Sequence, residues 1–141
     1  MVAIIMIDLK NVTKEFSDTL ALNHINLHFD NKGVFTIIGP SGAGKTTLLK
    51  ILALLLEPTK GQIFVNNVNV DNNMRYSLRS KFTMVFQNTL FFSSNVHDNI
   101  SYGLNIRNLP SDEVEKRIRD VLKRFDLIEL EKKLMFALSV G

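Results

Sequence analysis

The octapeptide GPSGAGKT is the feature that most constrains how this chain can fold. It runs from Gly39 to Thr46 and matches the pattern G-x-x-x-x-G-K-[ST] at every fixed position. Apolar segments flank it, VFTII at residues 34–38 and LLKILALLL at residues 48–56. A glycine-rich loop between a buried strand and a buried helix is the arrangement that holds a polyphosphate. The sequence therefore predicts a strand–loop–helix unit that binds a nucleotide.

The chemistry of phosphate binding explains the residue types in this loop. Glycine removes side chains that would keep the backbone away from the phosphates, and it allows the dihedral angles that turn successive N–H groups inward. The side chain of Lys45 can reach the β- and γ-phosphates, and the hydroxyl group of Thr46 can bind Mg²⁺. The alternative is a glycine-rich turn that merely packs, but the buried strand and helix on either side favour the nucleotide.

Hydrophobic periodicity predicts the elements around the loop. Apolar and polar residues alternate over residues 5–12 and 23–30, which indicates two half-solvated strands. The segments on either side of Asn66-Asn67 predict a hairpin, and FTMVF at residues 82–86 predicts a buried strand like the one at 34–38. A helix that is apolar nearly all round, and hence buried, is expected from about Lys45 to Leu56.

The last third of the chain is predicted to be helical. Ser111 is a good N-cap, and the acidic residues after it fit the first turn of a helix. An apolar stripe follows at helical spacing, formed by Val114, Ile118, Val121, Leu122 and Phe125. On the other face acidic residues precede basic ones by four positions, in the pairs Asp112/Lys116, Glu113/Arg117, Glu115/Arg119 and Asp120/Arg124. We therefore interpret these arginines as a solvated, paired face rather than a nucleic-acid patch.

The composition is that of one soluble globular domain. The chain has 141 residues, of which 45% are hydrophobic and 22% charged, and its formal net charge is +3. The charges form no block, so we expect no nucleic-acid partner. Cysteine is absent, and His24, His28 and His97 have no second ligand at metal spacing, so we interpret them as surface residues. No apolar run is long enough for a signal peptide or a membrane span.

The segment GPSGAGKTTLLKILALLLEPTKGQI, followed by TMVFQNTLFFSSNVHDNISYGL, resembles the nucleotide-binding subunit of ATP-binding-cassette (ABC) transporters. The resemblance runs over essentially the whole chain, and the order of its features is the specific part. It implies an α/β fold, a P-loop NTPase of the ABC type with an N-terminal antiparallel β-subdomain and a C-terminal helical subdomain. Residues 1–86 would hold the β-subdomain and the phosphate-loop part of the core, and residues 87–141 the Q-loop and the helical subdomain.

The resemblance also implies the site residues. The residues that match the family's phosphate loop, with ATP and Mg²⁺ as the bound groups, are Gly39, Pro40, Ser41, Gly42, Ala43, Gly44, Lys45, Thr46 and Thr47. Gln87 matches the Q-loop glutamine, which in the family contacts Mg²⁺ or the attacking water; a surface glutamine is the alternative. Lys45 and Gln87 are therefore the expected catalytic residues, and Thr46 and Gln87 the expected metal ligands. Phe16 lies where the family stacks an aromatic residue, more often tyrosine, on adenine, and a core phenylalanine is the alternative.

The last four residues resemble the family's signature, Leu-Ser-Gly-Gly-Gln. Leu138, Ser139 and Gly141 match its first, second and fourth positions, and Val140 departs at the third. In the family the signature of one subunit closes over the γ-phosphate bound to the other, so Ser139 and Gly141 are expected to contribute to nucleotide binding across a dimer. A valine at the third position could block the close backbone approach that glycine allows.

The family's next strand, which ends in Asp-Glu, and its switch histidine have no counterpart in this sequence. We therefore expect the chain to be the first part of a longer protein, cut at the signature. In the family that strand lies beside the phosphate-loop strand, so the core sheet should be incomplete and leave buried-type surface and an open edge. We expect such a chain to be marginally stable and to hydrolyse ATP poorly or not at all by itself.

The resemblance implies partners as well. These are a second nucleotide-binding subunit and transmembrane permease subunits, which would place the protein at the cytoplasmic face of the cell membrane. Residues 90–92 lie where the family forms a groove for a short permease helix; alternatively they pack into the chain's own core. The stretch SNVHDNISYGLNIR most resembles importers, for oxyanions such as tungstate or phosphate, with amino acids left open. A non-catalytic nucleotide-binding remnant or regulatory module shares every motif, and an unrelated P-loop kinase or GTPase is a third hypothesis.

Overall fold

The computed structural model describes residues 5–30, 33–88 and 90–138. Its contacts group into two compact units that divide in the sequence between Val85 and Phe86. The predicted division after residue 86 concerns the family's subdomains and stays a prediction. None of the helices within the described ranges has the length and apolar character needed to cross a membrane.

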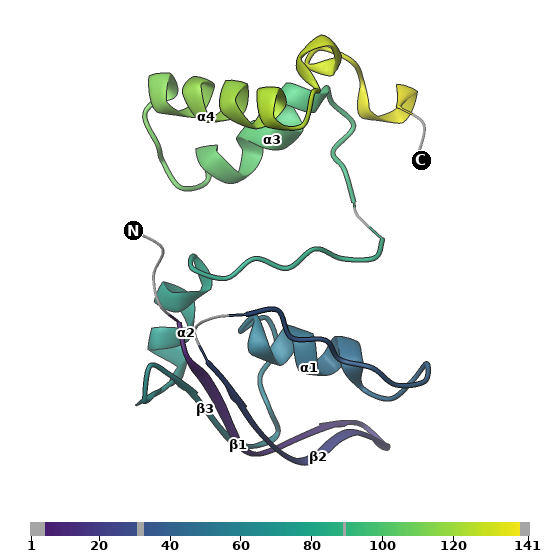
Figure 1. The fold of residues 1–141 in the computed structure, drawn as a ribbon, viewed down its shortest axis with the longest axis vertical. Coiled ribbons are helices and arrows are strands. Elements are labelled where there is room, and N and C mark those ends of the chain that lie inside the picture. The colour runs from purple at the N-terminus through teal and green to yellow at the C-terminus, as the bar shows by residue number, and fades with distance from the viewer. Residues whose placement is uncertain (1–4, 31–32, 89, 139–141) are drawn as a thin grey trace. The chain divides into compact units, whose positions relative to one another are not determined.

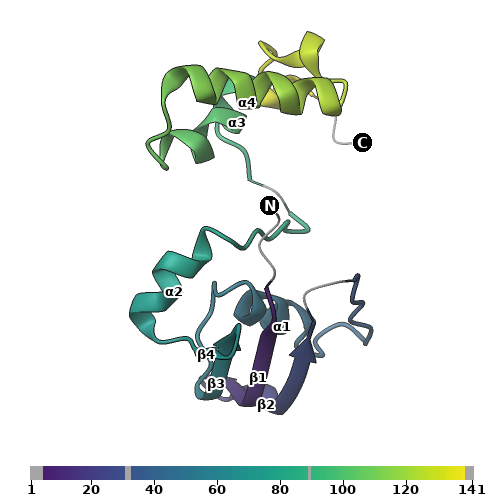
Figure 2. The ribbon, with the colours of Figure 1, turned by 60° about the vertical axis from the view of Figure 1, so that its left-hand side comes forward.

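The first unit is built on an antiparallel sheet with the strand order β2–β1–β3–β4. Its strands are β1 (Ile7–Phe16), β2 (Thr19–Phe29), β3 (Lys60–Val65) and β4 (Val68–Asn69). Helix α1 (Lys45–Leu52) covers one face of this sheet, and α2 (Asn72–Arg79) follows β4 (Figures 1 and 2). Buried apolar side chains of the sheet and of α1 form one core, which includes Leu9, Val12, Ile51 and Ile63.

The alternating sequence patterns are confirmed as β1 and β2. These strands pair with Ile7 opposite Phe29 and Phe16 opposite Thr19, so a two-residue turn joins them. The first strand therefore ends later than the predicted range 5–12, and the second begins earlier than the predicted range 23–30. The hairpin at Asn66-Asn67 is also confirmed. Both asparagines have positive φ angles, 50° and 64°, as a type I′ turn requires.

Helix α1 ends at Leu52 rather than at Leu56, because a Schellman motif terminates it. The N–H of Leu55 donates to the carbonyl of Lys50 at 2.8 Å, and the N–H of Leu54 donates to the carbonyl of Ile51 at 3.0 Å. Leu54 has a left-handed backbone, with φ of 57°, although its side chain is only 1% exposed. Burial of that side chain therefore offsets the strain of its backbone.

Two predicted buried strands are wrong for this structure, since residues 34–38 and 82–86 have no strand pairing. Val34 is 97% exposed, Ile38 90% and Val85 87%. A strand forms only where a neighbouring backbone supplies its hydrogen bonds, and the part of the chain that is described places no strand beside either segment. The result is the exposed apolar surface expected of an incomplete core sheet.

The second unit is helical. It contains α3 (Val96–Asn105), α4 (Ser111–Arg124) and the short 3₁₀ turns η1 (Ile128–Leu130) and η2 (Met135–Ala137), and α3 packs beside α4 (Figures 1 and 2). Its core is formed by Val96, Val114, Ile118 and Leu122.

Two details of α4 differ from the prediction. Pro110, not Ser111, occupies the N-cap position, because Ser111 already has helical geometry. The predicted apolar stripe is buried at Val114, Ile118 and Leu122, but Val121 is 39% exposed and Phe125, the C-cap residue, is 66% exposed. On the opposite face the predicted Glu113/Arg117 pair forms, with Nε of Arg117 3.0 Å from the carboxylate.

Candidate phosphate-binding site

The glycine-rich loop owes its shape to glycine at two positions. Gly42 and Gly44 have φ angles of 82° and 81°, in the left-handed region that favours glycine. A Cβ atom at Gly44 would lie 2.3 Å from the backbone carbonyl oxygen of Ala21 in β2, whereas a Cβ at Gly42 would meet nothing within 4 Å. Gly44 therefore lets the loop lie directly against the sheet.

Helix α1 begins at this loop without a side-chain cap. The N–H of Leu48 donates to the carbonyl of Gly44 at 2.9 Å, and Gly44, as the N-cap residue, has no side chain to offer the first N–H groups. Asp71 and Asn95 supply such caps to α2 and α3. The first N–H groups of a helix lack intrahelical acceptors and carry its partial positive charge. The start of α1 thus fits a phosphate group.

The side chain of Lys45 folds back over the loop. Its ammonium group donates to the carbonyl of Gly39 at 2.8 Å and to that of Pro40 at 2.6 Å. Among the described residues the ion pairs do not include Lys45, and the protein groups that its ammonium contacts are two carbonyl dipoles. A phosphate can therefore attract the ammonium group without first breaking an ion pair.

Thr46 is exposed in the first turn of α1, and Thr47 is half-buried beside it. No group of three or more His, Cys, Asp or Glu side chains in the described ranges could hold a metal ion. Magnesium ions that bind with phosphates need only one or two protein ligands, because phosphate oxygens and water complete the coordination shell. The Thr46 hydroxyl therefore fits Mg²⁺ that arrives with a nucleotide, rather than a separate metal site.

Phe16 lies at the end of β1, on the same hairpin that supports the loop. Lys14, two residues before it, pairs with Leu22, whose side chain would lie 3.1 Å from a Cβ at Gly44. The ring of Phe16 is 44% exposed, with the ammonium group of Lys14 5.0 Å from its centroid. Phe16 is therefore not a core residue, and its contact with adenine stays a prediction.

The structure does not test the other predicted site residues against this loop. Gln87 is exposed and belongs to the second unit. Its roles in catalysis and metal binding stay predictions. Ser139 and Gly141 lie outside the described residues.

The second unit has an apolar groove of about 500 Å³ beside residues 90–92. We call it the aromatic-loop groove; its lining includes Leu90, Phe91, Phe92, Asn99, Leu130 and Met135. Leu90 is 95% exposed, and Phe91 and Phe92 are both more than half exposed. The alternative that these residues pack into the chain's own core is therefore wrong within this unit.

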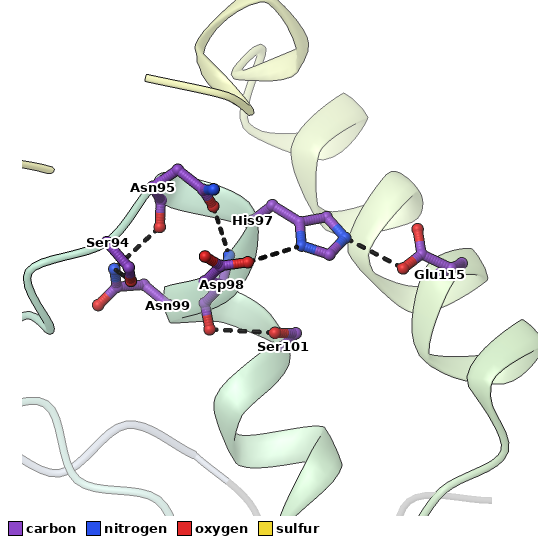
Figure 3. A network of polar contacts seen from close by, with 7 residues as sticks. All are labelled: Ser94, Asn95, His97, Asp98, Asn99, Ser101 and Glu115. Atoms are coloured by element: carbon purple, nitrogen blue, oxygen red, sulfur yellow. Dashed lines mark hydrogen bonds and ion pairs between the residues drawn. The ribbon is translucent and has the colours of Figure 1, made fainter. Parts of the chain in front are cut away.

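A polar network at the start of α3 is a feature that sequence reasoning missed (Figure 3). The ring of His97 is 3.1 Å from Glu115 of α4 and 3.4 Å from Asp98, and its side chain is only 27% exposed, so it is not a simple surface residue. Burial lowers the pKa of His97, but the hydrogen bonds to Asp98 and Glu115 outweigh it and raise that pKa above its ordinary value. The sequence feature that could have indicated this network is the pair Asn95 and Asn99, which lie one helical turn apart.

The chain matches one known protein family over most of its length. The family model described as ABC transporter matches residues 22–141. An Fe(3+) ions import ATP-binding protein of Photobacterium profundum is 38% identical over 135 residues, which cover 94% of this chain and 38% of that protein. A methionine import ATP-binding protein of Francisella tularensis subsp. holarctica is 40% identical over 136 residues, with 91% and 38% covered. The chain thus spans less than two fifths of the length of these relatives.

Solved structures give the same result. The structure of cbiO1 from Clostridium perfringens, part of the ABC transporter complex cbiONQ, matches with a TM-score of 0.81 and 31% identity over 97% of this chain and 57% of that one. A dimeric ATP-binding cassette in a post-hydrolysis state, bound to ADP and Pi, matches with a TM-score of 0.70 and 26% identity over 94% and 63%. These similarities confirm the α/β P-loop NTPase fold.

Proposed function

Because this chain belongs to the ABC transporter family, we propose that it forms the ATP-binding part of an import ATPase. In this proposal the loop of residues 39–47 holds the phosphates of ATP, and Lys45 exchanges its two loop carbonyls for the β- and γ-phosphates. Thr46 and Gln87 hold Mg²⁺, which neutralises phosphate charge, and Phe16 stacks on the adenine. Gln87 also orients the attacking water when ATP is hydrolysed.

The observation that carries the proposal is the approach of Gly44 to Ala21 at the uncapped start of α1. A glycine-rich turn that merely packs has no need of an uncapped helix behind it. In contrast, a phosphate site needs both the unpaired N–H groups and a lysine that is not held in an ion pair. The two relatives above, which are named as import ATP-binding proteins, support the same conclusion.

The partners in this proposal are a second nucleotide-binding subunit and transmembrane permease subunits at the cytoplasmic face of the membrane. Two observations support them: the matched structures include a subunit of the cbiONQ complex and a dimeric cassette. In the second unit the aromatic-loop groove offers exposed apolar side chains to a short permease helix.

The names of the relatives do not point to one transported substrate. Relatives of similar identity are named for Fe(3+), methionine, sulfate or thiosulfate, and spermidine or putrescine. Similar ATP-binding segments thus occur in proteins named for the import of metal cations, an amino acid, oxyanions and polyamines. We infer that this segment supplies energy and that other parts of the transporter select the substrate.

Titration of the purified chain with Mg-ATP tests the nucleotide part of the proposal. We expect binding that is about tenfold or more weaker in Lys45→Ala, because a charge-assisted phosphate contact is lost. Equal affinity in the variant would refute the phosphate site, and a preference for GTP would favour the kinase or GTPase hypothesis. Release of phosphate that depends on Lys45 supports the ATPase over the non-catalytic module. Binding without release is expected of both, because this chain by itself should hydrolyse ATP poorly.

Photo-crosslinking tests the partner separately. A photoreactive residue at Phe91, introduced into the protein in its native cells, should crosslink to a protein with several membrane spans. The same residue at Tyr76, which is 77% exposed in the first unit, is the matched control. Crosslinks only to soluble proteins, or equal yields at both positions, would refute the docking role of the groove.

A further inference from the structure

The side chain of Asn99, in the first turn of α3, binds the backbone N–H and carbonyl groups of Phe92, one of the residues that line the aromatic-loop groove. The N–H of Phe92 donates to Oδ1 of Asn99 at 2.8 Å, and Nδ2 of Asn99 donates to the carbonyl of Phe92 at 3.2 Å. Asparagine carries a donor and an acceptor in one plane, so it can pair with a residue as a neighbouring strand would. Aspartate has no donor, and alanine has neither group.

The same amide also reaches the turn that enters α3. Its Nδ2 donates to Oγ of Ser94 at 3.0 Å and to the carbonyl of Asn95 at 2.9 Å (Figure 3). With the Phe92 carbonyl, three acceptors surround the two N–H bonds of one amide group, so at least one hydrogen is shared. Together these contacts fix residues 92–95 relative to the axis of α3.

The ring of Phe92 is held by the same helix. It packs on Tyr102, with the ring centroids 4.2 Å apart and the planes tilted by 47°. Phe92 nevertheless remains 51% exposed, and Leu90 before it is 95% exposed. Fixing exposed apolar residues costs conformational entropy without the return of full burial. The restraint is therefore better explained by what the loop binds than by the stability of the core.

Another part of the groove lining is attached to the same turn. The N–H of Met135 donates to the carbonyl of Ser94 at 3.0 Å, and the N–H of Val96 donates to the carbonyl of Lys133 at 3.0 Å. Residues 94–99 therefore connect Phe92 to Met135, and both of these residues line the groove.

We propose that Asn99 is a positioning residue that holds residues 90–92 as a preformed wall of the aromatic-loop groove. The inference rests on the proposed function, in which the groove receives an apolar permease helix. A wall that is ordered in advance lowers the entropic cost of that binding. Asn99 itself acts through Phe92, whose backbone it fixes.

Amide hydrogen exchange, read residue by residue by NMR, tests the hydrogen bonds. In Asn99→Ala we expect the Phe92 amide to exchange about tenfold faster, and in Asn99→Asp, which keeps the acceptor, by less. Asn95→Asp is the matched control, because its carboxylate still caps α3 and Asn99 is untouched. Unchanged exchange at Phe92 in Asn99→Ala would overturn the proposal. So would an equal loss of protection at Ile118 in the core of α4, since Asn99 would then be a general structural residue.

A small apolar probe tests the groove itself. Anilinonaphthalene sulfonate is titrated into protein with ¹³C-labelled methionine methyl groups, and Met135 reports binding in the groove. Met84, among the apolar residues of the first unit, reports binding there. We expect Asn99→Ala to weaken the interaction about fivefold at Met135 and to leave Met84 unchanged, because only the wall loses its order.

Equal weakening at both methionines, or no change at Met135, would overturn the inference. Neither readout uses ATP or a permease. A failed crosslink from Phe91 would therefore refute the proposed partner while leaving the positioning role standing. Failure of the probe experiment would leave the phosphate site untouched.

Discussion

Gly44 and Ala21 meet through their backbones, because a Cβ atom at position 44 would lie only 2.3 Å from the carbonyl oxygen of Ala21. This contact joins the end of the phosphate loop to β2, the strand that also carries the partner of Phe16. The loop can lie this close to the sheet because Gly44 has no side chain. Substitutions at Gly42 and Gly44 should therefore separate the cost of a left-handed backbone from the cost of a clash with β2.

Gly44→Ala should lose more ATP affinity and more stability than Gly42→Ala. Both glycines have nearly the same left-handed φ angle, so alanine costs each about 1–2 kcal/mol of backbone strain. Only Gly44 meets the Ala21 carbonyl, so only there must the loop also move away from β2. Urea unfolding and Mg-ATP titration of both variants measure the difference. Equal losses in the two variants would show that φ alone explains these glycines.

Phe16→Ala should weaken Mg-ATP binding by about tenfold, because the adenine loses its stacking partner. The same change should barely alter the free energy of unfolding. The ring is 44% exposed, so its removal leaves no cavity in the core. Phe16→Tyr keeps the π-face and should bind ATP like the wild type. The matched control is Phe125→Ala, because Phe125 is an exposed phenylalanine of the second unit. Full ATP affinity in Phe16→Ala would refute the stacking role.

Local patterns predicted the parts of this fold that local contacts stabilise. Alternation placed β1 and β2, and two asparagines with positive φ angles form the hairpin between β3 and β4. The segments 34–38 and 82–86 failed for the opposite reason. Their apolar residues predict burial between neighbours, and a strand's hydrogen bonds belong to its neighbours rather than to its own sequence.

The same holds for the site: features formed by residues close in the sequence could be predicted, and contacts between residues far apart in the sequence could not. The phosphate-loop motif is visible in the sequence because its glycines, Lys45 and Thr46 lie within one short segment and each has a chemical role; their binding of phosphate stays a prediction. The role of Asn99 could not be predicted, because its bonds to Phe92 depend on how a loop folds back over α3. The sequence places His97 at the surface for a similar reason, since its partner Glu115 lies on a different helix.

Leu54→Gly should be more stable than Leu54→Ala, the reverse of the usual order in helices. Both variants lose a buried leucine side chain, at a cost of about 2–5 kcal/mol. Glycine also relieves the left-handed backbone at φ 57°, which alanine does not, so it should recover about 1 kcal/mol. Urea unfolding of both variants measures this difference. A more stable Leu54→Ala would contradict the Schellman motif at this position.

The second unit should be more stable at mildly acidic than at alkaline pH because of His97. Its pKa is raised in the folded unit: burial opposes protonation, but hydrogen bonds to Asp98 and Glu115 and the nearby charge of Glu131 outweigh it. Such a group stabilises the fold fully below its unfolded pKa, about 6.5, and the gain is lost as pH rises through the folded pKa. We therefore expect the urea midpoint to fall as the pH rises above about 6.5.

Tyr102 fluorescence in a Tyr76→Phe background reports unfolding of the second unit alone, because tryptophan is absent and these are the two tyrosines. His97→Gln should abolish most of the pH dependence, since glutamine does not titrate. His28→Gln is the matched control, because His28 also has a raised pKa, from its hydrogen bonds to Asp8 and Asp30, but lies in the first unit. A pH dependence that persists in His97→Gln and disappears in His28→Gln would assign the effect to the sheet. The His97–Glu115 contact would then contribute nothing measurable between α3 and α4.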